Sequence, residues 1–575
     1  MQTSSASTGP DRGSPLRRYG PVVAIVVVIA VIAAIVAFSG KDDKKPAATS
    51  SGSNSSNSSN GALPAGAITF NSSKGRTDLT FLDTCDKETG RVALPYAFTP
   101  ECFANVANNG GATAKGVTGE TITVVVYLAP DVDPVLDYIT QPINNNDTAD
   151  QIQATYEGYT ALFQKYMQTY GRKVQLKFLH GSGGSDSEVT ARADAVKAVD
   201  ELGAFAVWGG PVLAPAWTEE IKARGVICLA CPSIKDLSPS VFPIGAGGAE
   251  KYLQLSEYVT KKLKDKPAEF AGDPAFKTQN RSIGELYIST PGSTAEADAA
   301  GFRANLAKGG VTLKEQLPYR LDQLIAAPEI ATTLVSKLKA SGVTTVILST
   351  DPIAPKAFTE EATKQNYFPE WVYGNATLVD TAAFGRTYDQ TQWAHAFGIS
   401  MLAVREVEAV SDRFDLYRWF TGTKPPAPDT APVLWPQPGL FFAGLQAAGP
   451  NLTVDTFRQG LFSGPPSDKR IVSSPLITYG DHGLWPDTDY YGIDDFVEIW
   501  WDPTQTGPDE IHRTAPGLIR FVDGGKRYRL GEWTSELNVF KTDGSVTLLT
   551  ELSANEAPKE YPSPAGGSSS SSSAN

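Results

Sequence analysis

Several residues of this sequence, most of them polar or aromatic, lie at or soon after the ends of short apolar stretches, where buried parallel strands would end. They are Tyr127, Trp208, Gly210, Pro211, Ser233, Ser289, Thr290, Ser293, Asp351 and Asn375. Loops at the carboxyl ends of parallel strands form the ligand crevices of α/β proteins. The sequence therefore predicts that these residues bind a small polar molecule reversibly.

Three of these residues also have ordinary structural uses. Trp208 ends an apolar stretch, so it suits the edge of a core as well as a wall that stacks on a ligand. Asp351 could neutralise a ligand amine, but an aspartate before proline is also common in turns. Asn375 is interpreted first as a hinge residue, then as a turn residue and only then as a ligand contact.

The hydroxyl residues Ser289, Thr290 and Ser293 precede a predicted helix. Hydroxyls at this position commonly cap backbone N–H groups, and Ser293 is expected to be the cap. The same helix N-terminus could instead receive an anionic group of a ligand. Both interpretations are kept for these residues.

The elements that must position these residues follow an alternating pattern of strands and helices. Strands are predicted at 121–127, 174–178, 204–208 and 226–229 in a first series, and at 284–288, 311–317 and 344–348 in a second. Capping patterns at 185–188 and 293–296 mark the starts of two of the helices between them. The pattern indicates an α/β protein with two similar halves.

The N-terminal region has the composition of a membrane anchor. Residues 21–38 contain no charge, and as a helix they would span about 27 Å, close to one bilayer core. A cleaved signal peptide is the competing interpretation, because 37–39 could serve as its cleavage site. With an anchor, residues 1–20 are a cytoplasmic tail, and 39–66 form a disordered linker rich in Ser and Asn.

The four cysteines all follow this apolar segment, and they form two close pairs, Cys85 with Cys102 and Cys228 with Cys231. Two disulfides are expected, which favours an extracytoplasmic location for the C-terminal part of a single-pass protein of the cell membrane. The second pair has the spacing of a metal or redox motif, but no second such motif or nearby histidine completes a metal site. No metal is predicted.

Charge and motifs argue against two functional classes. The formal net charge is −13, so nucleic acid is not an expected partner. The four histidines lie far apart, and no metalloprotease, serine hydrolase or Walker A motif is present, so no enzyme activity is expected. The glycine-rich run 245–250 lacks the last glycine of a dinucleotide fingerprint and is interpreted as a crossover loop. No cofactor is predicted.

The order of motifs resembles that of type I periplasmic binding proteins, the family of branched-chain amino acid receptors of ABC importers. The resemblance rests on the segments 116–122, 180–186, 208–211, 230–237, 286–292, 301–311 and 524–528. It covers roughly residues 118–530 as a pattern rather than as one signature. The loop 211–214 departs from it, because amino acid receptors usually offer Ser or Thr there, and this departure leaves the ligand class open.

The resemblance implies two Rossmann-like lobes with parallel sheets, joined by hinge strands, that close over a small polar ligand such as an amino acid. Lobe I is then expected at 118–245 and 375–490, and lobe II at 246–374 and 491–555. An N-terminal extension with a disulfide at 67–117 lies outside the common core of the family, and the Pro-, Gly- and Ser-rich composition of 556–575 predicts a disordered tail. The implied partners are the membrane subunits of an ABC importer. A sensor ectodomain that signals through a separate partner is the main alternative, and a surface protein without a ligand is a weaker one.

Overall fold

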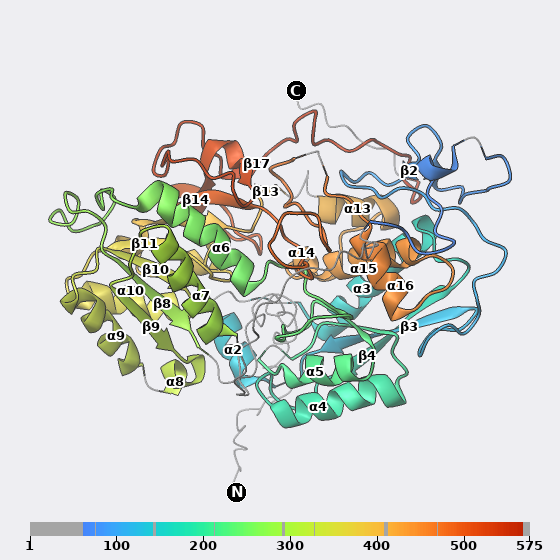
Figure 1. Cartoon of the computed structure of the whole chain (residues 1–575), viewed down its shortest axis with the longest axis horizontal. Helices are drawn as coiled ribbons and strands as arrows, with labels where there is room; N and C mark the ends of the chain where they lie inside the picture. Colours follow the sequence, from blue (N-terminus) through green and yellow to red (C-terminus); the bar gives the residue numbers. More distant parts are fainter. Residues whose placement is uncertain are drawn as a thin grey trace, which may run out of the picture.

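Two sheets organise the chain into two α/β lobes that lie side by side (Figure 1). The computed structural model describes residues 61–566, except 75, 131, 142–144, 146, 212, 290–293, 327, 408–411 and 468–469. The predicted membrane segment 21–38 and its flanking tail and linker up to residue 60 lie outside the described residues. Among the described helices, none is both long and apolar enough to cross a bilayer.

Lobe I contains a fully parallel sheet with the strand order β4-β3-β5-β6-β7. Its strands are β3 (Thr121–Leu128), β4 (Lys173–His180), β5 (Ala206–Trp208), β6 (Ile227–Leu229) and β7 (Val241–Phe242). Its helices are α2 (Pro134–Thr140), α3 (Ala149–Tyr166), α4 (Glu188–Val196, continued by a π turn at Lys197–Glu201), α5 (Ala216–Ala223), α13 (Asp412–Thr421), α14 (Ala431–Leu434), α15 (Pro436–Ala448) and α16 (Val454–Phe462).

The alternation of side chains along β3 explains why this sheet is covered on both faces. Val124 and Val126 belong to a core with residues of α3, α15 and α16, whereas Val125 and Tyr127 belong to a core with residues of α4 and α5. Successive strand residues point to opposite faces, so an almost wholly apolar strand must be buried on both sides. The predicted parallel strand at 121–127 is confirmed.

Lobe II contains a larger mixed sheet with the order β15-β14-β12-β11-β10-β8-β9, and β16 also pairs with β14. Its strands are β8 (Ile283–Ile288), β9 (Glu315–Tyr319), β10 (Thr345–Ser349), β11 (Glu370–Tyr373), β12 (Ala396–Ser400), β14 (Phe496–Pro508), β15 (Thr514–Phe521) and β16 (Arg527–Tyr528). Its helices are α6 (Gly248–Tyr258, continued by a π turn at Val259–Leu263), α7 (Ala295–Lys308), α8 (Leu321–Ala326), α9 (Glu329–Ala340), α10 (Ala354–Lys364), α11 (Ala382–Gly385), α12 (Gln390–Trp393) and the 3-10 turn η7 (Val522–Gly525).

The chain returns to lobe I later than the sequence indicated. The expected boundary at residue 375 is corrected, because β12 pairs in parallel with β11 and extends the sheet of lobe II. The return follows β13 (Arg405–Glu406), and the helices from α13 to α16 then complete lobe I. The weak periodicity after residue 371 hid this strand, since β12 is short and buried throughout.

Part of the predicted disordered tail 556–575 packs on the protein. The C-terminal strap, defined here as residues 548–566, starts with β17 (Leu548–Leu549), which pairs in parallel with β13. Lys559 then forms ion pairs with Asp86 (2.8 Å) and with Glu88 in lobe I's N-terminal extension. The Trp419 indole N–H also donates to a backbone carbonyl of the strap, that of residue 561, at 2.8 Å. Residues 567–575 lie outside the described part of the chain.

The N-terminal extension has little regular structure beyond η3 (Asn71–Ser73), β1 (Cys85–Asp86) and β2 (Arg91–Val92). The expected disulfide between Cys85 and Cys102 is present, with an S–S distance of 2.04 Å, and so is the expected bond between Cys228 and Cys231. The extension is clamped by the first disulfide. The second closes the short loop that follows β6.

Candidate ligand site between the lobes

Two aromatic residues predicted to face a ligand lie in the cores of lobe I. Trp208 is 0% exposed and packs against Tyr156 and Phe441, with ring centroids 5.7 and 5.5 Å away. Tyr127 packs edge-on against Trp217 at 5.0 Å, and burial raises the pKa of its hydroxyl. In this conformation both are core residues, which was the alternative interpretation of Trp208, and their ligand contact stays a prediction.

The loop after β5 is also tightly packed. The Trp217 indole N–H donates to the carbonyl of Gly209 at 3.1 Å. A Cβ atom on Gly210 would lie 2.5 Å from Trp217 Cδ1 and 2.9 Å from a carbon of the Pro232 ring, so only glycine fits there. Pro211 is buried in the same loop. These residues shape the edge of lobe I, and no polar side chain of this loop is described as open to a ligand.

Ser233 makes the contact that joins lobe I to the connection between the lobes. Its hydroxyl lies 2.7 Å from the hydroxyl of Tyr491, and burial raises the pKa of that phenol. The Tyr491 ring also covers the start of lobe II, because a Cβ atom on Gly247 would lie 2.6 Å from its Cε2 atom. Tyr491 was missed by the sequence analysis, and its place in a Tyr-Tyr pair before Gly492 gives no signal of this role.

Two side chains at the carboxyl edge of lobe II are occupied by local structure. Asp351 accepts the backbone N–H groups of Ile353 and Ala354, at 2.8 and 3.0 Å, and the hydroxyl of Tyr319. It therefore has the turn role that was its alternative, although burial raises its pKa. Ser289 donates to Glu296 at 2.7 Å.

The predicted ligand residues Thr290 and Ser293 lie outside the described residues. The residue at the N-cap of α7 is Thr294, whose hydroxyl donates to Asp298 rather than accepting a backbone N–H. In lobe I, the predicted cap at Ser185 is shifted by two residues, because Ser187 accepts the N–H of Thr190. Ser185 instead donates its hydroxyl and its backbone N–H to Asp133.

Asn375 lies where the loop after β11 begins, and it is 4% exposed. Its Oδ1 atom has no hydrogen-bond partner in the described part of the chain, and neither does the hydroxyl of the buried Thr350 after β10. The two loops are neighbours, because the N–H of Thr377 donates to the carbonyl of Thr350 at 3.3 Å. Buried polar atoms without partners are uncommon in folded proteins, so both atoms need an explanation.

Two charged residues near Asn375 were missed by the sequence analysis. Asp298 lies beside the first residue of α6: a Cβ atom on Gly248 would be 2.7 Å from Asp298 Oδ2 and 3.6 Å from Asn375 Nδ2. Lys251 is 3% exposed, and the only hydrogen bond found for its ammonium among the described residues is a long one, 3.5 Å, to the hydroxyl of Thr377. Burial lowers the pKa of Lys251 to about 8. Both residues lie on helices, Asp298 on α7 and Lys251 on α6, so a pattern of residues that follow strands does not select them.

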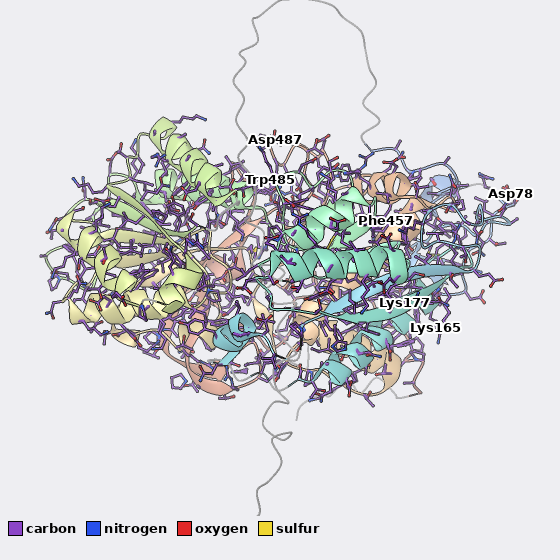
Figure 2. All side chains as sticks on the ribbon, turned by 90° about the horizontal axis from the view of Figure 1, so that it is seen from below. Asp78, Lys165, Lys177, Phe457, Trp485 and Asp487 are labelled. Atoms are coloured by element: carbon purple, nitrogen blue, oxygen red, sulfur yellow. A yellow bond between two sulfur atoms is a disulfide. The ribbon has the colours of Figure 1, made fainter. Side chains whose placement is uncertain are left out.

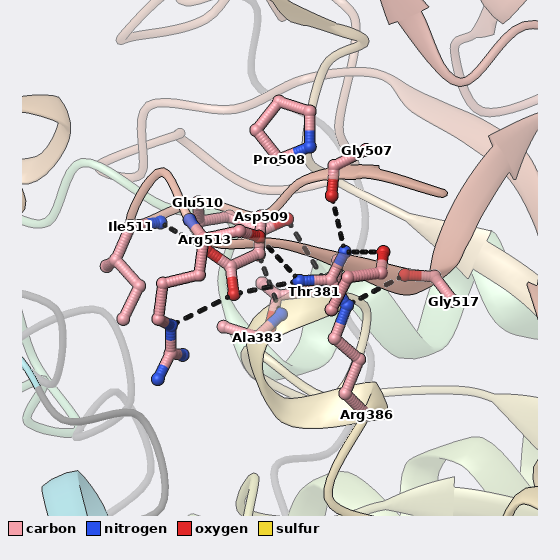
Figure 3. A network of polar contacts seen from close by, with 12 residues as sticks. Thr381, Ala383, Arg386, Gly507, Pro508, Asp509, Glu510, Ile511, Arg513 and Gly517 are labelled. Atoms are coloured by element: carbon pink, nitrogen blue, oxygen red, sulfur yellow. Dashed lines mark hydrogen bonds and ion pairs between the residues drawn. The ribbon is translucent and has the colours of Figure 1, made fainter. Parts of the chain in front are cut away.

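A network around Arg386 fixes the loop that follows Asn375 (Figure 3). The Arg386 guanidinium donates to three backbone carbonyls of β14 and β15, those of residues 507, 515 and 517, and pairs with Asp509 at 3.0 Å. Glu510 accepts the N–H groups of Ala382 and Ala383 at the start of α11. The tip of the β14–β15 hairpin therefore holds the loop that carries Asp380, whose pKa burial raises to about 6.

Two connections between the lobes run next to each other. The first connection is 243–247, the second is the return that follows β13, and the third is the segment 476–495, on which Trp485 and Asp487 are labelled in Figure 2. The first and the third are the two that lie side by side. The N–H of Gly492 donates to the carbonyl of Gly245 at 3.1 Å. Burial raises the pKa values of Glu250, Asp489 and Asp494 at this junction. Among the described residues, no group of three or more His, Cys, Asp or Glu side chains is arranged to hold a metal ion.

Comparison with known proteins finds similarity only among solved structures. No family model and no curated protein matches the chain. A branched-chain amino acid transporter substrate-binding protein from Streptococcus pneumoniae, in complex with isoleucine, is 12% identical with a TM-score of 0.45, over 70% of this chain and 99% of that one. An ABC transporter solute-binding protein from Rhodopseudomonas palustris, in complex with 3,4-dihydroxybenzoic acid, is 10% identical with a TM-score of 0.46, over 71% and 98%.

A fatty acid ABC transporter substrate-binding protein from Thermomonospora curvata is also similar, at 12% identity and a TM-score of 0.45, over 74% of this chain and 96% of that one. The compounds bound by or named for these three proteins differ in chemistry: isoleucine, 3,4-dihydroxybenzoic acid and fatty acid. At these values the likeness assigns no role to any individual residue of this chain.

Proposed function

We propose that this protein is an extracytoplasmic solute-binding protein, anchored by its N-terminal segment, whose two lobes close over a small ligand for uptake by an ABC importer. The observation that carries the proposal is the junction of the lobes. There, Ser233 of lobe I, Tyr491 of the third connection and the start of α6 meet beside buried polar atoms of lobe II that lack partners.

This arrangement suits capture better than catalysis. Parallel strands place their following loops at one edge of each sheet, and the loops after β6, β10 and β11 all contribute to the junction. The lobes are joined by chain segments that run next to each other, as a hinge requires. A ligand that contacts both lobes binds the closed form more tightly than the open one, and so it shifts the population toward closure.

The membrane anchor and the importer belong to the proposal as well. The uncharged segment 21–38, the Ser- and Asn-rich linker and the two disulfides support a tethered protein outside the cytoplasm. A tether would keep the binding lobes at a high local concentration near a transporter. Membrane subunits of an importer would then recognise the closed form.

The test is a ligand screen on the full chain in detergent, followed by small-angle X-ray scattering. Amino acids, amines, aromatic acids, fatty acids and sugars are compared by thermal unfolding, where a ligand at 100 times its Kd adds about 2.7 kcal/mol of stability. A hit that also lowers the radius of gyration supports capture by closure. A hit without a change in dimensions contradicts the closing mechanism, and no hit in any class favours a sensor that needs a partner or a surface protein without a ligand.

A further inference from the structure

The C-terminal strap, residues 548–566, begins at a firm attachment to lobe II. Just before the strap, Val546 exchanges both backbone hydrogen bonds with Phe521 of β15, at 2.8 and 3.0 Å. Leu548 and Leu549 then pair with β13, and both side chains pack against the larger apolar core. The first part of the strap is therefore held by lobe II and by the start of the second connection.

The middle of the strap lies along two of the connections between the lobes. The residue that follows β13 donates its N–H to the carbonyl of Leu549 at 2.9 Å. Glu556 is 6% exposed, and its carboxylate accepts the N–H groups of Val472 and Ser473, at 2.7 and 3.2 Å. These two residues follow α16 and lead into the third connection. Since the N–H of Val404 donates to the carbonyl of Val472 at 3.0 Å, the strap holds the second and third connections at one place.

The far end of the strap is fastened to the N-terminal extension and to α13, both on lobe I. Lys559 forms ion pairs with Asp86 at 2.8 Å and with Glu88 at 2.7 Å. The hydroxyl of Tyr561 donates to Asp86 at 2.8 Å, and the indole N–H of Trp419 donates to the carbonyl of Tyr561 at the same distance. The Lys559 ammonium holds the pKa of Asp86 well below its usual range, as expected for a carboxylate that is kept ionised by its partners.

The point where the strap is fastened belongs rigidly to lobe I. Asp86 lies in β1 next to Cys85, whose disulfide to Cys102 clamps the extension. The hydroxyl of Thr84 donates to the carbonyl of Tyr166, the last residue of α3, at 3.1 Å. Figure 1 shows the strap, in red, running from β17 beside lobe II across to the side of lobe I where β2 lies. A segment attached to both lobes must be displaced whenever the lobes rotate relative to each other.

The contacts on lobe I are suited to reversible release. The side chain of Lys559 is 46% exposed and that of Glu88 is 82% exposed. Exposed ion pairs are individually weak, and salt screens them. Most side chains of residues 551–560 are also exposed, so little apolar surface holds this part of the strap down. By contrast, β17 is held by backbone pairing and core packing, so the strap should separate from lobe I first.

We infer that the C-terminal strap is a releasable brake on the movement of the two lobes. While Lys559 is fastened to Asp86 and Glu88, the strap keeps the lobes near the arrangement seen in this structure. After release, the lobes sample a wider range of relative orientations. The inference goes beyond the proposed function, because it concerns movement in the absence of a ligand. Its test therefore uses no ligand, and failure of the ligand screen leaves it untouched.

The experiment measures the distance between the lobes in the full chain in detergent. Spin labels are attached to Val189→Cys on α4 of lobe I and to Lys308→Cys on α7 of lobe II, because both positions are exposed. Pulsed electron paramagnetic resonance then gives the distribution of label-to-label distances. A chain that ends at residue 557 lacks the fastening on lobe I but keeps β17, and its distribution should be about 1.5-fold wider than that of the parent. Lys559→Ala should widen the distribution less, in the same direction.

Lys115→Ala is the matched control. Lys115 forms an ion pair with Asp200 at 2.7 Å, and its side chain is 47% exposed, against 46% for Lys559. Its ion pair joins the extension to lobe I alone, so the distance distribution of this variant should equal that of the parent. Salt is the second control, because a rise from 0.1 to 1 M shortens the Debye length from about 10 Å to about 3 Å. High salt should widen the distribution of the parent and change that of Lys559→Ala less.

Two results would overturn the brake. One is an unchanged distance distribution in the chain that ends at residue 557. The other is an equal widening in Lys115→Ala, which would trace the movement to a loosened extension rather than to the strap. Thermal unfolding checks that each variant is folded. If the shortened chain does not fold, Lys559→Ala decides alone, and an unchanged distribution in that variant overturns the brake.

Discussion

The edges of the two sheets that face the junction differ in how they use polar groups. In lobe I, the loops after β5 and β6 are packed shut by Trp208, Pro211 and a disulfide, and Ser233 already has Tyr491 as a partner. In lobe II, Asn375 and Thr350 hold unpaired polar atoms next to Lys251. The indole Nε1 atom of Trp208 also lacks a partner, but its ring is enclosed by Tyr156 and Phe441. The comparison teaches that the unpaired atom of lobe I is locked in an aromatic core, whereas those of lobe II lie beside a charged side chain, even though both lobes have the same type of sheet edge.

The largest expected effect tests the rigid wall. Trp208→Ala removes a fully buried ring between Tyr156 and Phe441 and should cost about 4 kcal/mol of unfolding free energy, since it leaves a large cavity. The midpoint of urea unfolding measures this loss. The milder Trp208→Phe should leave the Kd of any ligand found in the screen within twofold. A large loss of affinity with little loss of stability would instead make Trp208 a ligand contact.

A somewhat smaller effect tests whether the edge of lobe II is held in place. Arg386→Ala removes one of the two ion pairs of the buried Asp509 and the donor to three backbone carbonyls of β14 and β15, so it should destabilise the protein by about 3 kcal/mol. Arg513→Ala is the control, because Arg513 pairs with the same Asp509 but its side chain is 39% exposed, so its loss should cost less than about 1 kcal/mol. Equal costs for the two variants would show that the network depends no more on Arg386 than on Arg513.

The disulfide after β6 should contribute less. Replacing both Cys228 and Cys231 by Ser opens a loop with a sequence separation of 3, and chain entropy predicts a cost of about 2 kcal/mol. Because the loop leads into Ser233, ligand affinity should fall as well. The same replacement at Cys85 and Cys102 should leave affinity unchanged, since that bond clamps the N-terminal extension. If ligand affinity fell only when Cys85 and Cys102 were replaced, the N-terminal extension rather than the loop after β6 would support ligand binding.

The smallest effect concerns pH. Burial and the neighbouring Glu250 raise the pKa of Asp489, so the folded state keeps a proton that the unfolded state loses above about pH 4. Stability should therefore fall as the pH rises through the folded pKa. Asp489→Asn keeps an oxygen for the N–H of Tyr491 and removes this titration. Urea unfolding should find the variant more stable than the parent by about 1 kcal/mol at pH 8, and the difference should shrink at pH 5.

Asp455→Asn serves as the control for this prediction, since the side chain of Asp455 is 79% exposed. It should follow the parent at both pH values. If the parent protein instead becomes more stable between pH 5 and pH 8, and by more than Asp455→Asn does, then Asp489 does not retain a proton at the junction of the connections.

Much of the fold was predictable because its strands are short, apolar and separated by capped helices. The strand at 121–127 and both disulfides were predicted correctly. The place where the chain returns to lobe I was not, because β12 is buried on both faces and gives no alternation to read. The predicted tail was also misjudged, since a polar composition does not exclude ion pairs such as that between Lys559 and Asp86.

The candidate site was harder to predict than the fold. Sequence reasoning selects residues at the ends of strands. This pattern identifies Asn375 and Ser233, but it also selects residues such as Tyr127 whose side chains are buried in a core. The sequence does not show whether the carboxylate of Asp351 is available to a ligand. In the structure it accepts two backbone N–H groups, which are brought to it only by the folded loop. Asp298 and Lys251 reach the junction from helices that pack there through tertiary contacts, and no local pattern marks them.

The C-terminal strap places both ends of the described chain on lobe I. Lys559 touches Asp86, and Ser563 donates to the carbonyl of Trp419, so the path of the chain nearly closes on itself, with lobe II inserted in the middle. When the two ends are pulled apart in a single-molecule stretching experiment, force should first break the contacts of the strap and then load lobe I. Lobe II should carry tension only after the strap has been released. Because both ends lie on lobe I, a peptide linker between residues 61 and 566 should also yield circular permutants that keep both lobes.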